Sequence, residues 1–595
     1  MSSPVVAKSD LITVTITVGG QKIPDVYQIS QIQVQRQVNR IPWAKITLLD
    51  GNPSEEDFDV SESSTFVPGG EIEIQAGYHS QESSIFKGIV VRHGIRIDGD
   101  GNSYLTVLCF DKAVKMTILR KSAYFLKKSS KDIIEQLVSA AGLSADVGGA
   151  GAVIKEMIQY NATDWDFVVS RAEASGRIVT VEDGKVSAKA PDFSADSGLL
   201  IKYGESMVEA EAEIDARSQL ASVTSKSWDF SGQTVQTGDS SEPTVNAQGN
   251  LSGSQLAQTM VSDSYQMITS APVTSGDLTE WANAQLMKSR LARIRGKVIF
   301  PGSAKPKPGQ IVQLAGMGAR FNGKAFIAGV MHRIEHGDWV TEAEFGLSPR
   351  WFVEEQSDIE APPAAGLLPG IHGLQIGKVK KIHEDPDGQT RIQVDVPMIA
   401  PSGDGVWARI ASPYATNKAG IFFMPEIGDE VILSFVNNDP SFPMIIGSLY
   451  SSQRTPPFTP DQPNTTKAIV SNSQLKITMD DVKKVIQIST PGGHIVTMSD
   501  DQKTITIVDS NSNKMEMASS GISISSPGDI TIKATGQIQM QAQTSISIKA
   551  TTDLSLQGLN VNATAQVALK AQGQAQAELS ASGQTTVRGA MVMIN

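Results

Sequence analysis

The chain has 595 residues, with 51 Lys and Arg against 63 Asp and Glu, so its formal net charge is -12 at pH 7. This length exceeds the roughly 250 to 300 residues at which a single hydrophobic core stops growing, which predicts several domains. The excess of acidic groups opposes a phosphate backbone and disfavours nucleic-acid binding. A single cysteine, Cys109, excludes disulfides within the chain and cysteine-based metal cages.

The N-terminal sequence lacks the basic and apolar regions of a signal peptide. No stretch approaches the roughly 18 apolar residues needed to span a bilayer. We therefore expect a soluble protein that is made in the cytoplasm without a signal peptide.

The first part of the chain, residues 1–353, is predicted to be mixed β with two helices. It begins with the alternating strand pattern Leu11–Val18. The first helix is predicted between the capping serines Ser129 and Ser130 and the stop residue Gly142. Its apolar stripe consists of Ile133, Ile134, Leu137 and Val138.

The second helix is predicted from the capping pair Asp277 and Glu280 to a basic last turn before Gly296. Between the two helices, the polar segment Thr237–Gln255 is typical of a long surface loop. In Ala361–Gly366, proline and glycine then interrupt any apolar periodicity of a helix or a strand. This composition predicts a linker over residues 354–373.

Residues 374–450 contain five short apolar segments separated by glycine turns, which predicts a small β-barrel. A second proline-rich linker spans residues 451–465. The remaining residues, 466–595, are called the needle. Apolar positions in its distal part recur every eight residues, most regularly over 528–593, which we call the octad repeat; the register slips by one after Leu559.

The apolar columns of the octad repeat alternate with polar residues, so one face of each short strand is predicted to be buried. The residues expected in this core are Ile530, Ile532, Ile538, Met540, Ile546, Ile548, Leu554, Leu556, Val561, Leu569, Leu579 and Val587. Eight residues per side make a very thin solenoid for one chain, whereas three chains can share a triangular core. We therefore predict an intertwined triple-stranded β-helix in a homotrimer. A single-chain solenoid and an aggregation-prone tail remain alternatives.

These features together resemble VgrG proteins and the hub-and-spike assembly of phage T4. The most specific part of the resemblance is an OB-fold signature within residues 374–450. Its positions are Trp407, Arg409, Pro425, Gly428, Asp429, Phe435, Asp439, Pro440 and Gly447. Weaker motifs in Phe86–Val90, Tyr160–Trp165 and Phe321–Gly323 are similar to the hub domains of that family.

The resemblance implies a mainly β, multidomain fold with a hub of two barrel-like β domains and helices, an OB-fold barrel and the trimeric needle. It implies a structural spike of a contractile injection system, assembled into a phage-tail-like particle and then secreted or injected. The implied partners are an Hcp-like tail tube, baseplate components, effector cargo and, transiently, a target membrane. A PAAR-type tip protein would contact Met591, Met593, Ile594 and Asn595 at the apolar end.

Enzymatic alternatives find little support in the sequence. His332–His336 has the H-x-x-E-H spacing of zinc peptidases, but the alternating pattern around it predicts a strand, which separates the two histidines. The linker 451–465 is too short for an inserted lysozyme. We therefore expect no catalysis, no cofactor and no metal. A fibre-like adhesin for a receptor or glycan remains an alternative function.

The barrel could also bind single-stranded nucleic acid, because OB folds often do so through aromatic residues on a basic groove. Phe422 and Phe423 lie in the apolar run Ile421–Met424, beside the acidic turn Glu426–Glu430. We therefore expect both rings to pack in the barrel core and expect no nucleic-acid partner.

Overall fold

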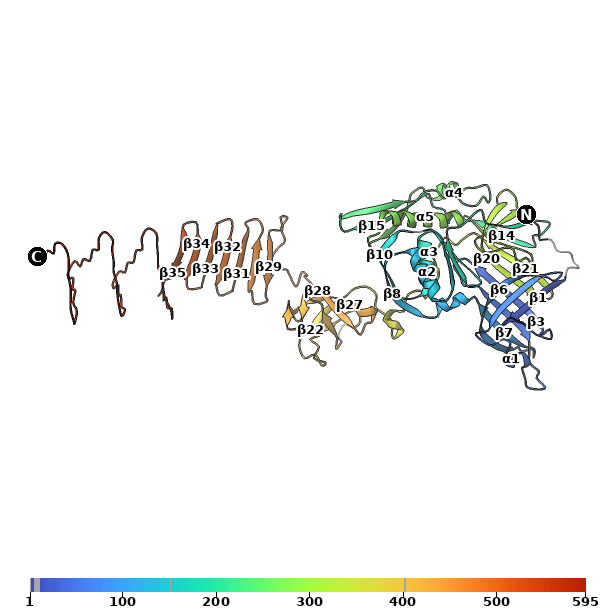
Figure 1. Cartoon of the computed structure of the whole chain (residues 1–595), viewed down its shortest axis with the longest axis horizontal. Helices are drawn as coiled ribbons and strands as arrows, with labels where there is room; N and C mark the ends of the chain where they lie inside the picture. The colour runs from blue at the N-terminus through green and yellow to red at the C-terminus, as the bar shows by residue number, and fades with distance from the viewer. Residues whose placement is uncertain (1, 5–10, 150, 401–402, 595) are drawn as a thin grey trace. The chain divides into compact units, whose positions relative to one another are not determined.

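The computed structural model describes residues 2–4, 11–149, 151–400 and 403–594, and it is mainly β (Figure 1). The chain divides into two compact units, Met1–Leu449 and Tyr450–Asn595. Among the described residues, no helix is long and apolar enough to cross a membrane.

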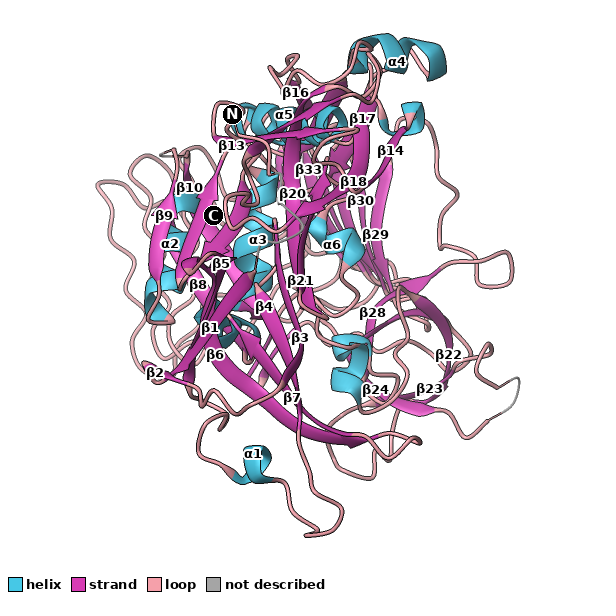
Figure 2. Cartoon of the chain, turned by 90° about the vertical axis from the view of Figure 1, so that its right-hand side faces the viewer, coloured by secondary structure: helices cyan, strands magenta, loops and turns pink. Residues whose placement is uncertain are grey.

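A 13-stranded sheet dominates the first unit, and Figure 2 shows many of its strands side by side. The N-terminal strands join the later ones where β3 pairs antiparallel with β20, from Gln37 opposite Gly329 to Gln31 opposite Glu335. The strands are β1 (Ile12–Val18), β2 (Gln21–Lys22), β3 (Ile29–Gln37), β4 (Trp43–Leu49), β5 (Glu71–Tyr78), β6 (Gln81–Ile97), β7 (Ser103–Phe110), β13 (Asp196–Lys202), β14 (Glu209–Ile214), β18 (Ile294–Pro301), β19 (Ile311–Ala315), β20 (Gly323–Glu335) and β21 (Asp338–Phe345).

The sheet serves two separate hydrophobic cores, because alternate side chains of each strand point to one face. The N-terminal core is built around Phe66 and Phe86, and the second core around Phe300 and Phe345. Cys109 is fully buried in the first core, as its apolar strand context predicts. The expected β-rich N-terminal region is confirmed, and its two halves share one hydrogen-bonded sheet.

The first predicted helix is confirmed as α2 (Ser130–Ala140), with Ser129 and Asp132 forming a reciprocal cap. Its predicted apolar stripe is buried, and Gly142 follows with a φ of +74°. The second, α5 (Ser275–Leu291), is capped by Thr274, three residues earlier than predicted. It also ends earlier than predicted, because the following residues enter β18.

The sequence analysis missed helices α3 (Asp164–Ala174) and α4 (Gly253–Met260), as well as two helices of four residues each. Helices α2 and α3 pack into a third core with small sheets. The remaining elements of this part are α1 (Asp59–Glu62), β8 (Arg120–Ser129), β9 (Ser144–Val147), β10 (Val153–Thr163), β11 (Ile178–Glu182), β12 (Lys185–Lys189), β15 (Val223–Asp229), β16 (Thr234–Asp239), β17 (Tyr265–Thr269) and α6 (Phe352–Glu355).

A closed five-stranded barrel follows, with the strand order β22-β23-β24-β28-β27. Its strands are β22 (Gln375–Lys381), β23 (Ile392–Asp395), β24 (Val406–Ile410), β27 (Glu430–Phe435) and β28 (Pro443–Leu449), and β25 (Ala415–Thr416) and β26 (Ala419–Gly420) form a separate hairpin. The predicted barrel of five short strands is confirmed. Its core holds Val379, Ile392, Val394, Ala408, Val431, Leu433 and Ile445.

The second unit contains a seven-stranded antiparallel sheet in which every strand pairs with the next along the chain. The strands are β29 (Thr466–Val470), β30 (Lys476–Asp480), β31 (Val485–Ser489), β32 (Ile495–Ser499), β33 (Thr504–Val508), β34 (Lys514–Ala518) and β35 (Gly521–Ser525). The described residues after β35, 526–594, contain no strand in the single chain. The proximal part of the needle is therefore a sheet within one chain, which the sequence analysis did not anticipate.

The histidine pair of the H-x-x-E-H sequence lies on and after strand β20. His332 is fully buried against Trp339, and its Nδ1 lies 3.0 Å from the Thr341 hydroxyl. His336 lies in the turn that follows, with a φ of +53°. The two side chains therefore do not share a helix face, and no cluster of three potential metal ligands occurs among the described residues.

His332 should make the first unit sensitive to acid. Burial, with a smaller contribution from Arg36, lowers the pKa of His332 to about 3, against about 6.5 in an unfolded chain. Between these values the unfolded state binds one more proton than the folded state, so stability is lost as the pH falls from about 6.5 toward about 3. We expect a loss of about 2 kcal/mol between about pH 7 and about pH 5.

Urea unfolding of wild type and His332→Gln at both pH values measures this effect. The variant should lose less stability on acidification than the wild type. Equal losses in the two proteins would assign the acid sensitivity to other groups.

Candidate assembly surfaces

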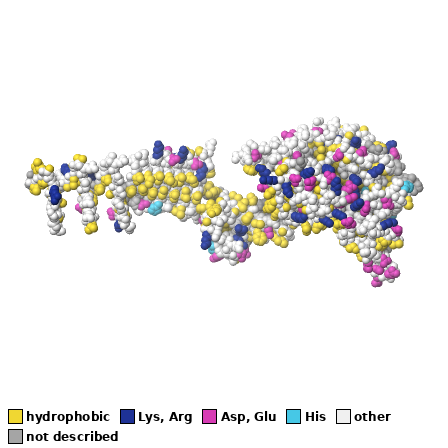
Figure 3. All heavy atoms as spheres, in the orientation of Figure 1, with side chains coloured by type: hydrophobic (Ala, Val, Ile, Leu, Met, Phe, Trp, Pro, Cys, Tyr) yellow, Lys and Arg dark blue, Asp and Glu magenta, His cyan; other side chains and the backbone are white. Residues whose placement is uncertain are grey.

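One face of the β29–β35 sheet is apolar apart from Lys467 on the edge strand β29 (Figure 3). The strand registers place its side chains opposite one another, such as Ile477 opposite Ile488 and Ile488 opposite Val496. The members of this apolar face are Ile469, Ile477, Met479, Ile486, Ile488, Val496, Met498, Ile505, Ile507, Met515, Met517, Ile522 and Ile524.

The opposite face of the same sheet is mixed, because Val485, Ile495 and Val508 lie in the rows beside a polar central row. Its central row contains Thr478, Gln487, Thr497, Thr506 and Glu516 in register. The amide of Gln487 lies 3.3 Å from the Thr497 hydroxyl across the strands. The polar central row can be hydrated, so the other face of the sheet is the one with the larger apolar surface to cover.

The second unit has no hydrophobic core of its own. Among its described residues, Ser499 is the only one that is buried. On the apolar face, exposure ranges from partly buried side chains to 67% at Ile522. Covering half-exposed aliphatic side chains stabilises by about 1 kcal/mol each, so the face offers on the order of 10 kcal/mol per chain. This is as much as a whole domain's net stability.

All twelve residues predicted to form the core of the octad repeat are exposed in the single chain. Ile530 and Ile546 are each 54% exposed, and Ile532 is 72% exposed. The structure therefore brings none of them into a core within one chain. Met591, Met593 and Ile594 at the predicted tip are exposed as well, and Asn595 lies outside the described residues.

The signature residues of the barrel lie in two turns and on strands β24, β27 and β28. Gly428, with a φ of +90°, donates its N–H to the Val379 carbonyl over 2.8 Å, and the Asp429 carboxylate accepts from the Glu426 N–H over 2.9 Å. Together with buried Pro425, these contacts tie the turn before β27 to strand β22. Their role is to close the barrel.

The second turn follows the buried Phe435. Asp439 is also buried, and its carboxylate accepts from the Ser441 N–H over 2.8 Å, while Pro440 sits inside the same turn. On the strands, half-buried Trp407 and exposed Arg409 flank core residue Ala408 on β24, and Gly447 lies on β28.

The expectation that Phe422 and Phe423 pack in the barrel core is wrong. The rings are 76% and 66% exposed, because the segment between β26 and β27 runs outside the closed barrel. Both line a groove of about 790 Å³ together with Arg409, Tyr414 and Met424. An apolar run of four residues does not by itself distinguish a core strand from such a surface segment.

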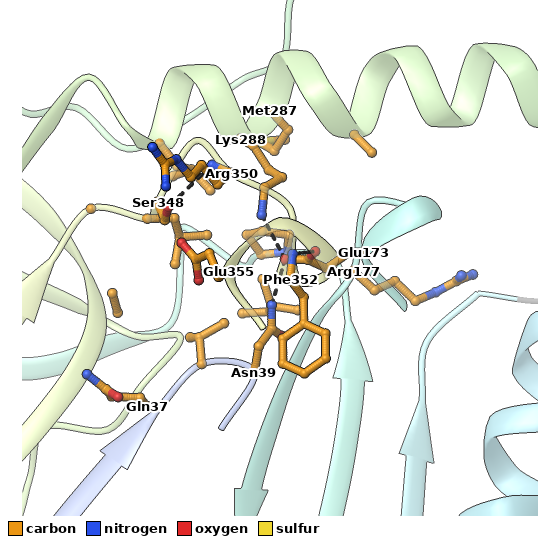
Figure 4. A pocket seen from close by; sticks show the side chains of 18 of the residues that line it. Gln37, Asn39, Glu173, Arg177, Met287, Lys288, Ser348, Arg350, Phe352 and Glu355 are labelled. Atoms are coloured by element: carbon orange, nitrogen blue, oxygen red, sulfur yellow. Dashed lines mark hydrogen bonds and ion pairs between the residues drawn. The ribbon is translucent and has the colours of Figure 1, made fainter. Parts of the chain in front are cut away.

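A cavity of about 230 Å³ lies in the first unit around Glu173 of α3 (Figure 4). The buried Glu173 carboxylate accepts from Asn39 over 2.8 Å, from Lys288 of α5 over 2.7 Å and from the Phe352 N–H over 2.7 Å. Lys288 also lies over the Trp351 ring, 5.3 Å from its centre. Glu173 thus fastens two helices, the β3–β4 turn and the start of α6 to one another.

The Glu173 contacts favour a structural role over a catalytic one. Donors of the same chain engage both carboxylate oxygens and use three of their roughly four acceptor positions, as expected of a carboxylate that holds structural elements together. The sequence analysis did not single out Glu173, because its partners are far away in sequence.

Two protein-family models match the chain. The model described as the Alg8 N-terminal domain matches residues 8–336, which is more than half of the chain. The model described as the type VI secretion system/phage-baseplate injector OB domain matches residues 375–450, and these residues coincide with the five-stranded barrel.

Curated relatives match short stretches of the chain. The type VI secretion system spike protein VgrG5 of Pseudomonas aeruginosa is 28% identical over 119 residues, which cover 19% of this chain and 15% of that protein. The actin cross-linking toxin VgrG1 of Vibrio cholerae is 31% identical over 108 residues, covering 13% and 10% respectively. The chain thus spans at most about a seventh of the length of these two relatives.

Solved structures of tail and secretion proteins are similar to this chain with low TM-scores. A tail protein of Neisseria meningitidis has a TM-score of 0.44 at 12% identity, covering 57% of this chain and 98% of its own. An Escherichia coli type VI secretion component has a TM-score of 0.35 at 13% identity, covering 73% and 100% respectively.

Replacing Glu173 should destabilise the first unit. Glu173→Gln keeps the shape but leaves the ammonium of Lys288, whose side chain is only 13% exposed, without its charge partner. Removing one partner of a buried pair costs about 3 kcal/mol or more. We expect a clear fall in the urea midpoint followed by tryptophan fluorescence.

The matched control is Glu205→Gln, which removes a surface pair with Lys202. Exposed pairs contribute well under about 1 kcal/mol, so this variant should unfold close to the wild type. If both variants unfold at the same urea concentration, the Glu173 contacts do not stabilise the fold.

Proposed function

We propose that this chain, which belongs to the Alg8 N-terminal domain family, is the trimeric hub and spike of a contractile injection system. The match of its barrel to the OB domain of type VI secretion and phage-baseplate injectors supports a place in the baseplate. The resemblance of the sequence to VgrG-type spike proteins is confirmed at the level of family.

The main observation in support of a trimer is the uncovered apolar face of the β29–β35 sheet. A face of this kind exposes more contiguous apolar surface than a soluble monomer normally shows. Three copies can turn these faces toward one axis and leave the polar faces in water. The octad repeat extends the same alternation, so its columns would line the same axis and form the predicted triple-stranded β-helix.

Each part of the chain would then have its own role in the particle. Residues 1–353 would form the hub on the tail tube, residues 374–450 a collar, and residues 466–595 the shaft, with 354–373 and 451–465 as linkers. The hub would contact an Hcp-like tube protein and baseplate components. We expect a mechanical role with no catalysis, in which sheath contraction drives the shaft through a target membrane.

The apolar end of the chain supports a separate tip protein. Met591, Met593 and Ile594 are exposed in succession, which suits a PAAR-type cap over the end of a prism. Effector cargo would travel with this cap or with the hub. The particle would assemble in the producing cell and then be secreted or injected.

The trimer predicts a mass in solution of three times the 63.5 kDa chain. Light scattering on the purified full-length protein measures this mass directly. A wild-type protein of single-chain mass would remove the basis of the proposed shaft.

A pair of neighbouring substitutions tests which face of the sheet lies inside. Ile505→Asp would bury three charges around one axis and should leave the protein monomeric. Thr506→Asp, on the polar face of the same strand, should remain trimeric. Identical masses for the two variants would show that the faces are assigned wrongly.

A further inference from the structure

The two halves of the needle differ in strand pairing: the proximal half forms a paired sheet within one chain, and the octad repeat does not. This difference implies an order of assembly. Resting on the proposed function, we propose that the apolar face of the β29–β35 sheet is the surface on which three copies first join. The octad repeat winds into a shaft only after that contact is made.

The strands of the proximal sheet pair with one another within a single chain, without a second copy. Strands β30 to β34 each pair with a neighbour on both sides, and every register is regular. The chain therefore presents a preformed surface, and joining three of them orders little further backbone. Association of preformed surfaces avoids most of the entropic cost of coupled folding and binding.

The binding partner that fits this face is a second copy of the same chain. From β30 to β35 its two central rows contain only Ile, Val and Met, and Lys467 on the edge strand β29 is the one polar side chain in them, so the face offers almost no hydrogen-bond donor or acceptor to a glycan or a nucleic acid. The sequence that follows repeats the same alternation in columns that find no cover within the chain. Copies meeting along both segments would cover them together.

The octad repeat cannot form the first contact. Its described residues have neither strand partners nor buried side chains in one chain. Ordering it alone would lose backbone entropy without gaining hydrogen bonds or buried apolar area. The repeat must therefore be held close to two other copies before it can fold.

Strand β35 supplies the starting edge for that folding. It pairs with β34 on one side, and in the sheet order its other edge has no strand beside it. Open strand edges bind further strands through their unpaired N–H and C=O groups. Once three copies are joined, the first octads can pair on these edges, and winding proceeds toward the C-terminus.

The test compares one charge in each half of the full-length needle. Ile488→Asp lies on the apolar face, and Ile546→Asp lies in the octad columns. Gln487→Asp and Ser547→Asp are the matched controls at neighbouring polar positions. Solution mass gives the number of copies, and amide hydrogen exchange over residues 528–593 reports whether the shaft is wound.

We expect Ile546→Asp to remain trimeric while amide exchange around its octad accelerates by about tenfold or more. Ile488→Asp should be monomeric, with rapid exchange throughout the repeat, and both controls should match the wild type. Unchanged fluorescence of the tryptophans in the first unit would show that the variants remain folded there.

Two results would overturn the proposed order. A monomeric Ile546→Asp protein would show that the repeat is needed for the first contact, and a trimeric Ile488→Asp protein with a protected repeat would show that the sheet is dispensable. Either result leaves the trimeric spike itself intact. A monomeric wild type would instead refute the proposed function.

Discussion

The needle depends on a single constraint, which is that its apolar residues alternate along strands and cannot be covered by their own chain. In the first unit, the large sheet packs around cores in which side chains such as Phe86 and Phe345 are fully buried. In the second unit, Ser499 is the only buried side chain among the described residues. The proximal sheet has its backbone pairing within one chain, but its apolar side chains find no cover there.

The first unit, by contrast, is held by contacts that join distant parts of one chain. The Glu173 carboxylate collects donors from positions 39, 288 and 352, and the turn at Gly428 closes the barrel onto Val379. Buried charges and tight turns of this kind fix geometry at some cost in stability.

Sequence patterns predicted the local features well and the long-range ones poorly. Capping at Ser129 and the buried stripe of α2 follow from neighbouring residues, as do the five barrel strands. Phe422 and Phe423 were misassigned because a short apolar run has no period. The octad columns were read from the sequence, but the predicted trimer core stays a prediction, since one chain cannot show it.

The proximal sheet escaped prediction because its strands β29 to β34, which begin at residues 466, 476, 485, 495, 504 and 514, do not follow the eight-residue period by which the octad repeat was recognised. Its turns use residues that reverse the chain: Lys484 and Lys503 adopt positive φ, and the Asp480 and Asp509 carboxylates each accept two backbone N–H groups. Such turns return each strand beside its predecessor. The described octads contain no hairpin of this kind. Turn chemistry therefore decides which half of the needle pairs its strands within one chain.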